Sequence, residues 1–136
     1  MMNISTTPKT ETKKKILLVD DELDITISLK LFLEEKGFEV DAYNSPSSAI
    51  ANYRPGLYHI ILLDIKMPQI DGFELCERIQ QMDSNANVFF LTAVSDIRGY
   101  TEGKKSLKEN HLIQKPIDGQ ELLKRIAVEL IYIYSH

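Results

Sequence analysis

The chain has 136 residues, of which 43% are hydrophobic, and a formal net charge of −4 at pH 7. This length suits one domain with a hydrophobic core and excludes two domains of ordinary size. The negative charge argues against nucleic acid as a direct partner, and the single cysteine excludes an internal disulfide. No stretch approaches the ~18 apolar residues of a membrane span. We therefore expect a cytoplasmic protein without membrane insertion.

Short apolar runs alternate with helical patterns along most of the chain. After a Lys- and Thr-rich tail over 1–14, strands are predicted at about 16–20, 38–43, 59–63, 87–92 and 111–114. Helices are predicted at about 23–36, from Pro46 to Tyr53, at 73–82 and after the N-cap Asp118. This alternation indicates βαβ units and a parallel sheet. The segment 95–110 contains Gly99 and Gly103, so a helix there should be short, irregular or mobile.

Each helical pattern presents one apolar face. The helix over 23–36 should end at Gly37, the one over 73–82 should point Met82 inward, and the last should carry an apolar stripe. The inward residues are predicted to be Ile25, Leu29, Phe32, Leu33, Leu75, Cys76, Ile79, Met82, Leu122, Leu123, Ile126, Leu130 and Ile133.

Four of the apolar runs stop at residues able to bind a phosphoryl group or a metal ion. The stops are Asp20-Asp21, Asp64, Thr92 and Lys115. Because ligands bind at the carboxyl ends of the strands in an open α/β sheet, these side chains should converge on one site.

Three carboxylates in one site repel one another unless a cation or a proton is present. Two unit charges 5 Å apart cost about 3 kcal/mol at an effective dielectric near 20. Oxygen ligands of this kind suit Mg²⁺, which also binds phosphate. Lys115 adds positive charge and Thr92 a hydroxyl donor, and an aspartate is the natural nucleophile. The pattern predicts phosphoryl transfer to an aspartate.

Four segments resemble the receiver domain of two-component response regulators. They run from Ile16 to Glu22, from Leu62 to Leu75, from Leu91 to Ala93 and from Lys115 to Asp118. The resemblance covers about 16–134 and implies a receiver domain over 15–136. The implied fold is a three-layer, doubly wound (βα)5 domain of the flavodoxin-like type, with five parallel strands in the order 2-1-3-4-5.

The same resemblance assigns roles to the converging residues. Asp64 would accept a phosphoryl group from a sensor histidine kinase or a small phosphodonor. Asp20, Asp21, Asp64 and the backbone carbonyl of Lys66 would hold Mg²⁺, with Mn²⁺ as a substitute. Thr92 would bind a phosphoryl oxygen, Lys115 would pair with the phosphate, and the bond between Lys115 and Pro116 would be cis. The domain would catalyse only its own phosphorylation and dephosphorylation, without turnover of a separate substrate.

Two departures from the family lie near the expected output surface. Leu112 stands where the family usually has an aromatic switch residue, and 107–110 lack the usual Gly-Ala pair. We therefore expect the switch to involve rearrangement of 95–110. His111 is expected to be a surface residue at the start of a strand. Val94 offers no polar group to orient water, which predicts slow loss of phosphate.

The expected output is a change in partner binding through the face of the fourth helix, fifth strand and fifth helix. The partner would be an effector protein or a histidine phosphotransfer domain, and the chain would act as a stand-alone receiver. It is expected to be a monomer, with dimerisation on phosphorylation left open.

Two alternatives belong to other functional classes. The first is an interaction module of receiver fold that works without phosphorylation. The second is an aspartate-nucleophile phosphatase of the haloacid dehalogenase type, in which a second acid follows the nucleophile by two residues. Lys66 occupies that position here, which argues against phosphatase turnover.

Overall fold

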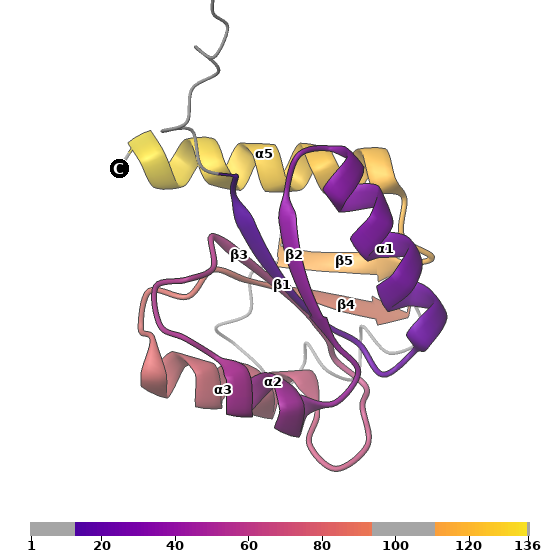
Figure 1. The fold of residues 1–136 in the computed structure, drawn as a ribbon, viewed down its shortest axis with the longest axis vertical. Helices are drawn as coiled ribbons and strands as arrows, with labels where there is room; N and C mark the ends of the chain where they lie inside the picture. The colour runs from indigo at the N-terminus through magenta and orange to yellow at the C-terminus, as the bar shows by residue number, and fades with distance from the viewer. Residues whose placement is uncertain (1–12, 94–110, 136) are drawn as a thin grey trace, which may run out of the picture.

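The computed structural model describes residues 13–93 and 111–135 and contains one five-stranded parallel sheet (Figure 1). The strands are β1 (Lys15–Val19), β2 (Glu39–Tyr43), β3 (Ile60–Asp64), β4 (Val88–Ala93) and β5 (Leu112–Lys115). The described helices are α1 (Leu23–Glu35), α2 (Pro46–Asn52), α3 (Gly72–Met82) and α5 (Gly119–Ser135). The strand order β2-β1-β3-β4-β5 confirms the predicted flavodoxin-like fold class.

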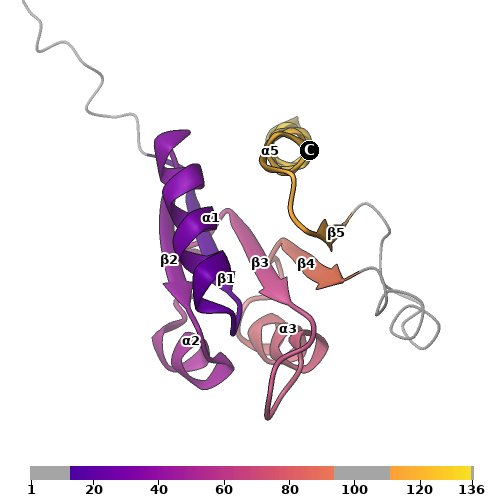
Figure 2. The same ribbon diagram turned by 90° about the vertical axis from the view of Figure 1, so that its right-hand side faces the viewer.

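Alternate residues of the central strands enter two separate hydrophobic cores. Leu17 and Val19 of β1 pack on the side of α2 and α3. Ile16 and Leu18 pack on the side of α1 and α5. Figure 2 shows the two helix pairs on opposite faces of the sheet. Because both faces are covered, β1 and β3 are apolar at nearly every position, which is typical of buried parallel strands.

The predicted strand ends lie within one residue of the observed ends, and two helix boundaries are confirmed in detail. Gly37 has a φ of 98°, and the N–H of Phe38 donates to the carbonyl of Leu33 at 3.2 Å, as expected for a glycine that ends a helix. At the start of α5, the Asp118 carboxylate accepts from the N–H groups of Gln120 and Glu121.

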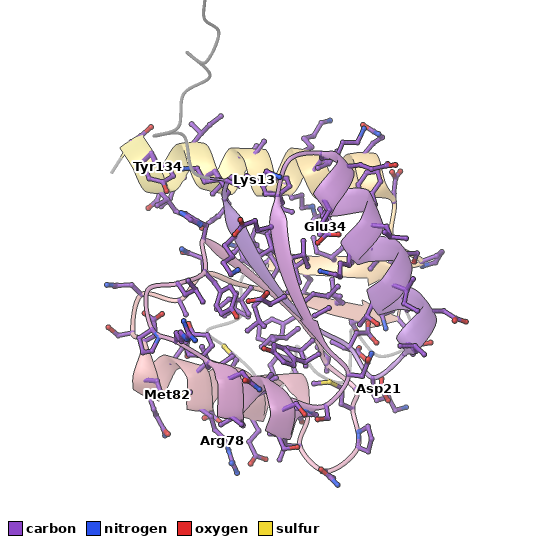
Figure 3. The ribbon with its side chains drawn as sticks, in the orientation of Figure 1. Lys13, Asp21, Glu34, Arg78, Met82 and Tyr134 are labelled. Atoms are coloured by element: carbon purple, nitrogen blue, oxygen red, sulfur yellow. The ribbon has the colours of Figure 1, made fainter. Side chains whose placement is uncertain are left out.

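Two expectations about individual side chains are wrong. Met82 is 40% exposed, because the α3 residues of the core end at Ile79 and the last turn extends past the sheet (Figure 3). His111, predicted as a surface residue, is instead partly buried, with 14% of its side chain exposed. Its ring stacks on Phe89 with centroids 4.4 Å apart, and its Nε2 lies 3.2 Å from the Glu129 carboxylate.

Several predictions concern residues outside the described ranges. These are the flexible tail over 1–14, of which only Lys13 and Lys14 are described, the weak helix over 95–110, and Val94 with its effect on phosphate lifetime. Across 13–93 and 111–135, no helix is both long enough and apolar enough to cross a bilayer.

Candidate functional site

The carboxyl ends of β1 and β3 bring three aspartates together. Val19 pairs with Leu63 in the sheet, so Asp20 and Asp64 follow as neighbours. Asp20, Asp21 and Asp64 each offer a carboxylate oxygen, and these oxygens lie within 4.8 Å of one another. Asp20 is fully buried and Asp64 is 4% exposed. Asp21, which is labelled in Figure 3, is open to solvent. The predicted convergence of the three acids is therefore present.

Lys115, at the end of β5, reaches the same carboxylates. Its Nζ lies 3.0 Å from Asp20 Oδ2, 3.4 Å from Asp64 Oδ1 and 2.8 Å from Glu22 Oε1. The peptide bond between Lys115 and Pro116 is cis, as the resemblance implied. Glu22 was not among the predicted site residues, although it follows the Asp pair directly in the sequence.

The crowding of like charges shifts the protonation of the site. Burial, followed by the charge of Asp20, raises the pKa of Asp64 to about 8, although Lys115 acts in the opposite direction. Burial alone would lower the pKa of Lys115, but its hydrogen bond to the Glu22 carboxylate and the negative charges of Asp20 and Asp64 raise it. Without a metal ion, these interactions therefore favour a charged Lys115 and shift Asp64 toward its protonated form.

The donor set fits a hard divalent cation. Asp20 Oδ2 is buried and makes an ion pair with Lys115, but it accepts no hydrogen bond from the described residues. Asp21 opens the cluster to solvent, which suits Mg²⁺ because this ion keeps several waters. Asp20, Asp21 and Asp64 are the residues that would hold it. The backbone carbonyl of Lys66 stays a predicted ligand.

The loop between β3 and α3 packs tightly against Asp64. The N–H of Ile70 donates to the Pro68 carbonyl at 2.9 Å across Gln69, whose φ is 75°, which is a γ-turn of the strained kind. The N–H of Gly72 donates to the backbone carbonyl of Ile65 at 2.7 Å. A Cβ at Gly72 would collide with the carbonyl oxygen of Asp64. Glycine therefore lets the loop close against the end of β3.

Thr92 lies in the last part of β4 and is buried. Its neighbour Leu91 pairs with Asp64 across the sheet, which places Thr92 one residue further toward the carboxyl edge. The Thr92 hydroxyl donates to the Ala93 carbonyl at 3.2 Å. Its contact with a phosphoryl oxygen stays a prediction.

His111 and Leu112 lie at the other end of β5 from Lys115. The structure does not bring either of them to the carboxylates. His111 also contacts the Val88 carbonyl through Nδ1 at 2.8 Å, and the Leu112 carbonyl accepts from Arg125 of α5 at 2.5 Å. Both residues therefore connect β5 with its neighbours, and their role in switching stays a prediction.

Known proteins share this combination of sheet order and acidic site. Residues 16–127 match the family model of the response regulator receiver domain. The chain belongs to this family. Receiver domains bind Mg²⁺ at an acidic pocket, and this chain has a cluster of three aspartates that could hold such an ion.

Individual relatives agree with the family assignment. The transcriptional regulatory protein PcoR of Escherichia coli is 30% identical over 117 residues, which are 86% of this chain and 51% of PcoR. A receiver domain from Clostridium thermocellum has a TM-score of 0.76 and 25% identity, covering 89% of this chain and 97% of that one. The non-phosphorylated HemR receiver domain of Leptospira biflexa has a TM-score of 0.75 and 30% identity, covering 86% and 94%.

The receiver chain spans about half the length of the curated relatives that it matches. Receiver domains of two-component systems are signalling modules that interact with histidine kinases, and they are generally not enzymes with a separate substrate. The family membership therefore gives the class of function, while the individual steps and partners are matters for proposal.

Proposed function

We propose that this receiver domain is a phosphorylation-activated switch in which Asp64 accepts a phosphoryl group from a histidine kinase. The observation that carries the proposal is the position of Lys115 Nζ, 3.4 Å from Asp64 Oδ1 and 3.0 Å from Asp20 Oδ2. The Lys115 ammonium group thus lies where it can neutralise a phosphoryl group on Asp64, and its ion pair with Asp20 holds it there.

Among the three acids, Asp64 is best placed to be the nucleophile. Asp20 is fully buried, and its Oδ1 accepts the Glu22 N–H at 2.9 Å. Asp21 is exposed and lies at the rim of the cluster. Asp64 lies beside the metal-binding acids and Lys115 and remains slightly open to solvent. We therefore assign the nucleophile to Asp64.

The proposed transfer is a simple displacement at phosphorus. A carboxylate oxygen of the ionised Asp64 forms the new O–P bond, the P–N bond of the phosphohistidine breaks, and the departing imidazole nitrogen takes up a proton from solvent. Lys115 neutralises the phosphoryl oxygens, and the Thr92 hydroxyl can turn from the Ala93 carbonyl to donate to one of them. When bound, Mg²⁺ supplies charge that favours the ionised Asp64 and the transferred group.

An apolar surface beside the site suits the helix of a kinase. Leu23, Ile27 and Leu31 lie four residues apart on α1 and are 58%, 51% and 60% exposed. An adjoining groove between α1 and the start of α5 is lined by apolar side chains and by Lys115. We expect Ile27→Glu to slow transfer from the kinase and to leave the reaction with acetyl phosphate unchanged.

The proposed output is a change in partner binding at the surface that includes β5 and α5. Val128, Ile131 and Tyr132 are 60%, 67% and 57% exposed on α5. Arg125 joins α5 to the Leu112 carbonyl, so displacement of β5 would be transmitted to this surface. The partner would be an effector protein or a histidine phosphotransfer domain.

Intact-mass measurement after incubation with acetyl phosphate and Mg²⁺ tests the acceptor. We expect one phosphoryl group on the native chain and none on Asp64→Asn or on native protein in EDTA. Equal labelling of Asp64→Asn would overturn the assignment of the acceptor. No labelling of a folded native chain would favour the alternative, an interaction module that works without phosphorylation.

A further inference from the structure

A hydrogen-bonded side chain outside the predicted site connects the end of β2 to the metal-binding acids. The register of the sheet pairs Val19 with Tyr43, so Asp20 and Asn44 are the residues that follow β1 and β2. Asn44 Nδ2 donates to the backbone carbonyl of Asp20 at 2.9 Å and to the hydroxyl of Thr26 at 2.9 Å. Both amide hydrogens are therefore used.

The direction of each hydrogen bond is fixed by chemistry. A carbonyl oxygen only accepts, so the Asn44 side chain must present its NH₂ group to Asp20. The Thr26 hydroxyl donates its own hydrogen to the Leu23 carbonyl at 2.9 Å, which leaves a lone pair for the second Asn44 hydrogen. Thr26 is 3% exposed, so its hydroxyl depends on protein partners rather than on water.

The backbone of Asp20 is held through both its N–H and its C=O. Its N–H donates to the Tyr43 carbonyl at 3.1 Å, and its C=O accepts from Asn44. The side chain of Asp20 then emerges into the cluster with Oδ1 on the Glu22 N–H and Oδ2 next to Lys115. The orientation of this carboxylate therefore depends on a backbone anchor that the β2 end supplies.

We infer that Asn44, with Thr26, is a positioning residue for divalent-cation binding at the Asp20, Asp21 and Asp64 cluster. This inference rests on the proposed function, because it concerns the ion that accompanies phosphorylation. An aliphatic residue at 44 cannot donate to Asp20. An aspartate at position 44 would place a second hydrogen-bond acceptor against the Asp20 carbonyl. Groups that orient metal ligands affect metal affinity strongly when removed, typically by about 10- to 100-fold.

The first measurement is a titration of Mn²⁺ binding, in which the loss of the electron paramagnetic resonance signal of free Mn²⁺ reports the bound ion. We expect Asn44→Ala to raise the Kd for Mn²⁺ about tenfold. Thr26→Val, which removes the hydroxyl and keeps the shape, should weaken binding in the same direction. Thr26→Ser should stay closer to the native protein because it restores the hydroxyl.

Ser45→Ala is the matched control. Ser45 adjoins Asn44, and its hydroxyl accepts the Ser48 N–H at 3.2 Å to cap α2, so its loss lowers stability without touching the acids. We expect Ser45→Ala to bind Mn²⁺ like the native chain. Equal losses of Mn²⁺ affinity in Ser45→Ala and Asn44→Ala would show a general effect of stability and would overturn the inference.

The second measurement separates binding from chemistry. In Asn44→Ala, the Mg²⁺ concentration that gives half the maximal rate of acetyl phosphate labelling should rise about tenfold. The rate at saturating Mg²⁺ should stay within about twofold of native, because Asn44 touches no reacting atom. Native Mn²⁺ affinity in Asn44→Ala would overturn this inference and leave the proposed function intact. A native chain that neither bound Mn²⁺ nor took up phosphoryl would overturn both.

Discussion

Replacing Asp64 by asparagine should stabilise the metal-free protein. The pKa of Asp64 rises from a reference of 3.8 to about 8 in the folded chain, first through burial and then through the charge of Asp20. The folded state therefore keeps a proton that the unfolded chain releases. Stability from this group is fully present below pH 3.8 and is lost as pH rises through the folded pKa near 8. Asparagine does not ionise in either state, so the Asp64→Asn variant does not lose this stability as the pH rises.

The size of the effect follows from the shift. Each pKa unit corresponds to about 1.4 kcal/mol, so about three units at pH 7 give an upper value of about 4 kcal/mol. Local relaxation reduces this value, and we expect a gain of about 2–4 kcal/mol in the free energy of unfolding. For a domain of this size, that gain corresponds to roughly 6–15 °C in Tm.

Urea unfolding of the native chain and Asp64→Asn in EDTA, from pH 5 to pH 9, measures this difference. The advantage of Asp64→Asn should grow by about 1.4 kcal/mol per pH unit up to pH 8 and then level off. Saturating Mg²⁺ should shrink it, because the cation binds the native acids and stabilises the folded state. Parallel curves for native and Asp64→Asn would refute the charge argument.

Three further predictions concern separate contacts. Gly72→Ala should lower stability by about 1–3 kcal/mol and slow acetyl phosphate labelling, because the new Cβ collides with the Asp64 carbonyl; urea unfolding and intact mass measure both. Burial and then the charge of Lys14 lower the pKa of His59, whose Nδ1 accepts the Lys15 N–H. The stability that His59 contributes is therefore present above pH 6.5 and is lost on acidification. In His59→Asn, the free energy of unfolding should depend less on pH between pH 5 and 6.5. His111→Ala should cost about 1–3 kcal/mol in chemical unfolding, since it loses a stacking contact and a hydrogen bond.

The fold and the main acids were predictable because they depend on backbone rules. Strands buried on both faces read as unbroken apolar runs, and the carboxyl ends of parallel strands share one edge of the sheet. Those two rules predict that Asp20, Asp64 and Lys115 lie together, and the structure places Lys115 Nζ within 3.4 Å of both carboxylates.

The features that escaped prediction depend on side-chain direction across the sheet. Glu22 and Asn44 look like ordinary loop residues in the sequence, and only the register of β1 on β2 brings Asn44 to the Asp20 carbonyl. The burial of His111 depends on the pairing of β4 with β5, which brings its ring onto Phe89. Periodicity carries no signal for such pairs, because the partners lie far apart in the chain.

The charges of the site explain why a fold would keep an arrangement that destabilises it. Three aspartates lie together, and Lys115 pairs with two of them, so the metal-free site favours a proton on Asp64. A divalent cation would bring the ionised aspartates and Lys115 close to neutrality. Phosphorylation would then replace the single charge of Asp64 by about two, placed next to Lys115. In the proposed switch, each chemical state of the site has a different electrostatic energy, and Lys115 would carry that difference into β5. Because Arg125 and His111 contact both the β5 region and α5, we propose that the same charges that oppose folding would shift the surface where a partner binds.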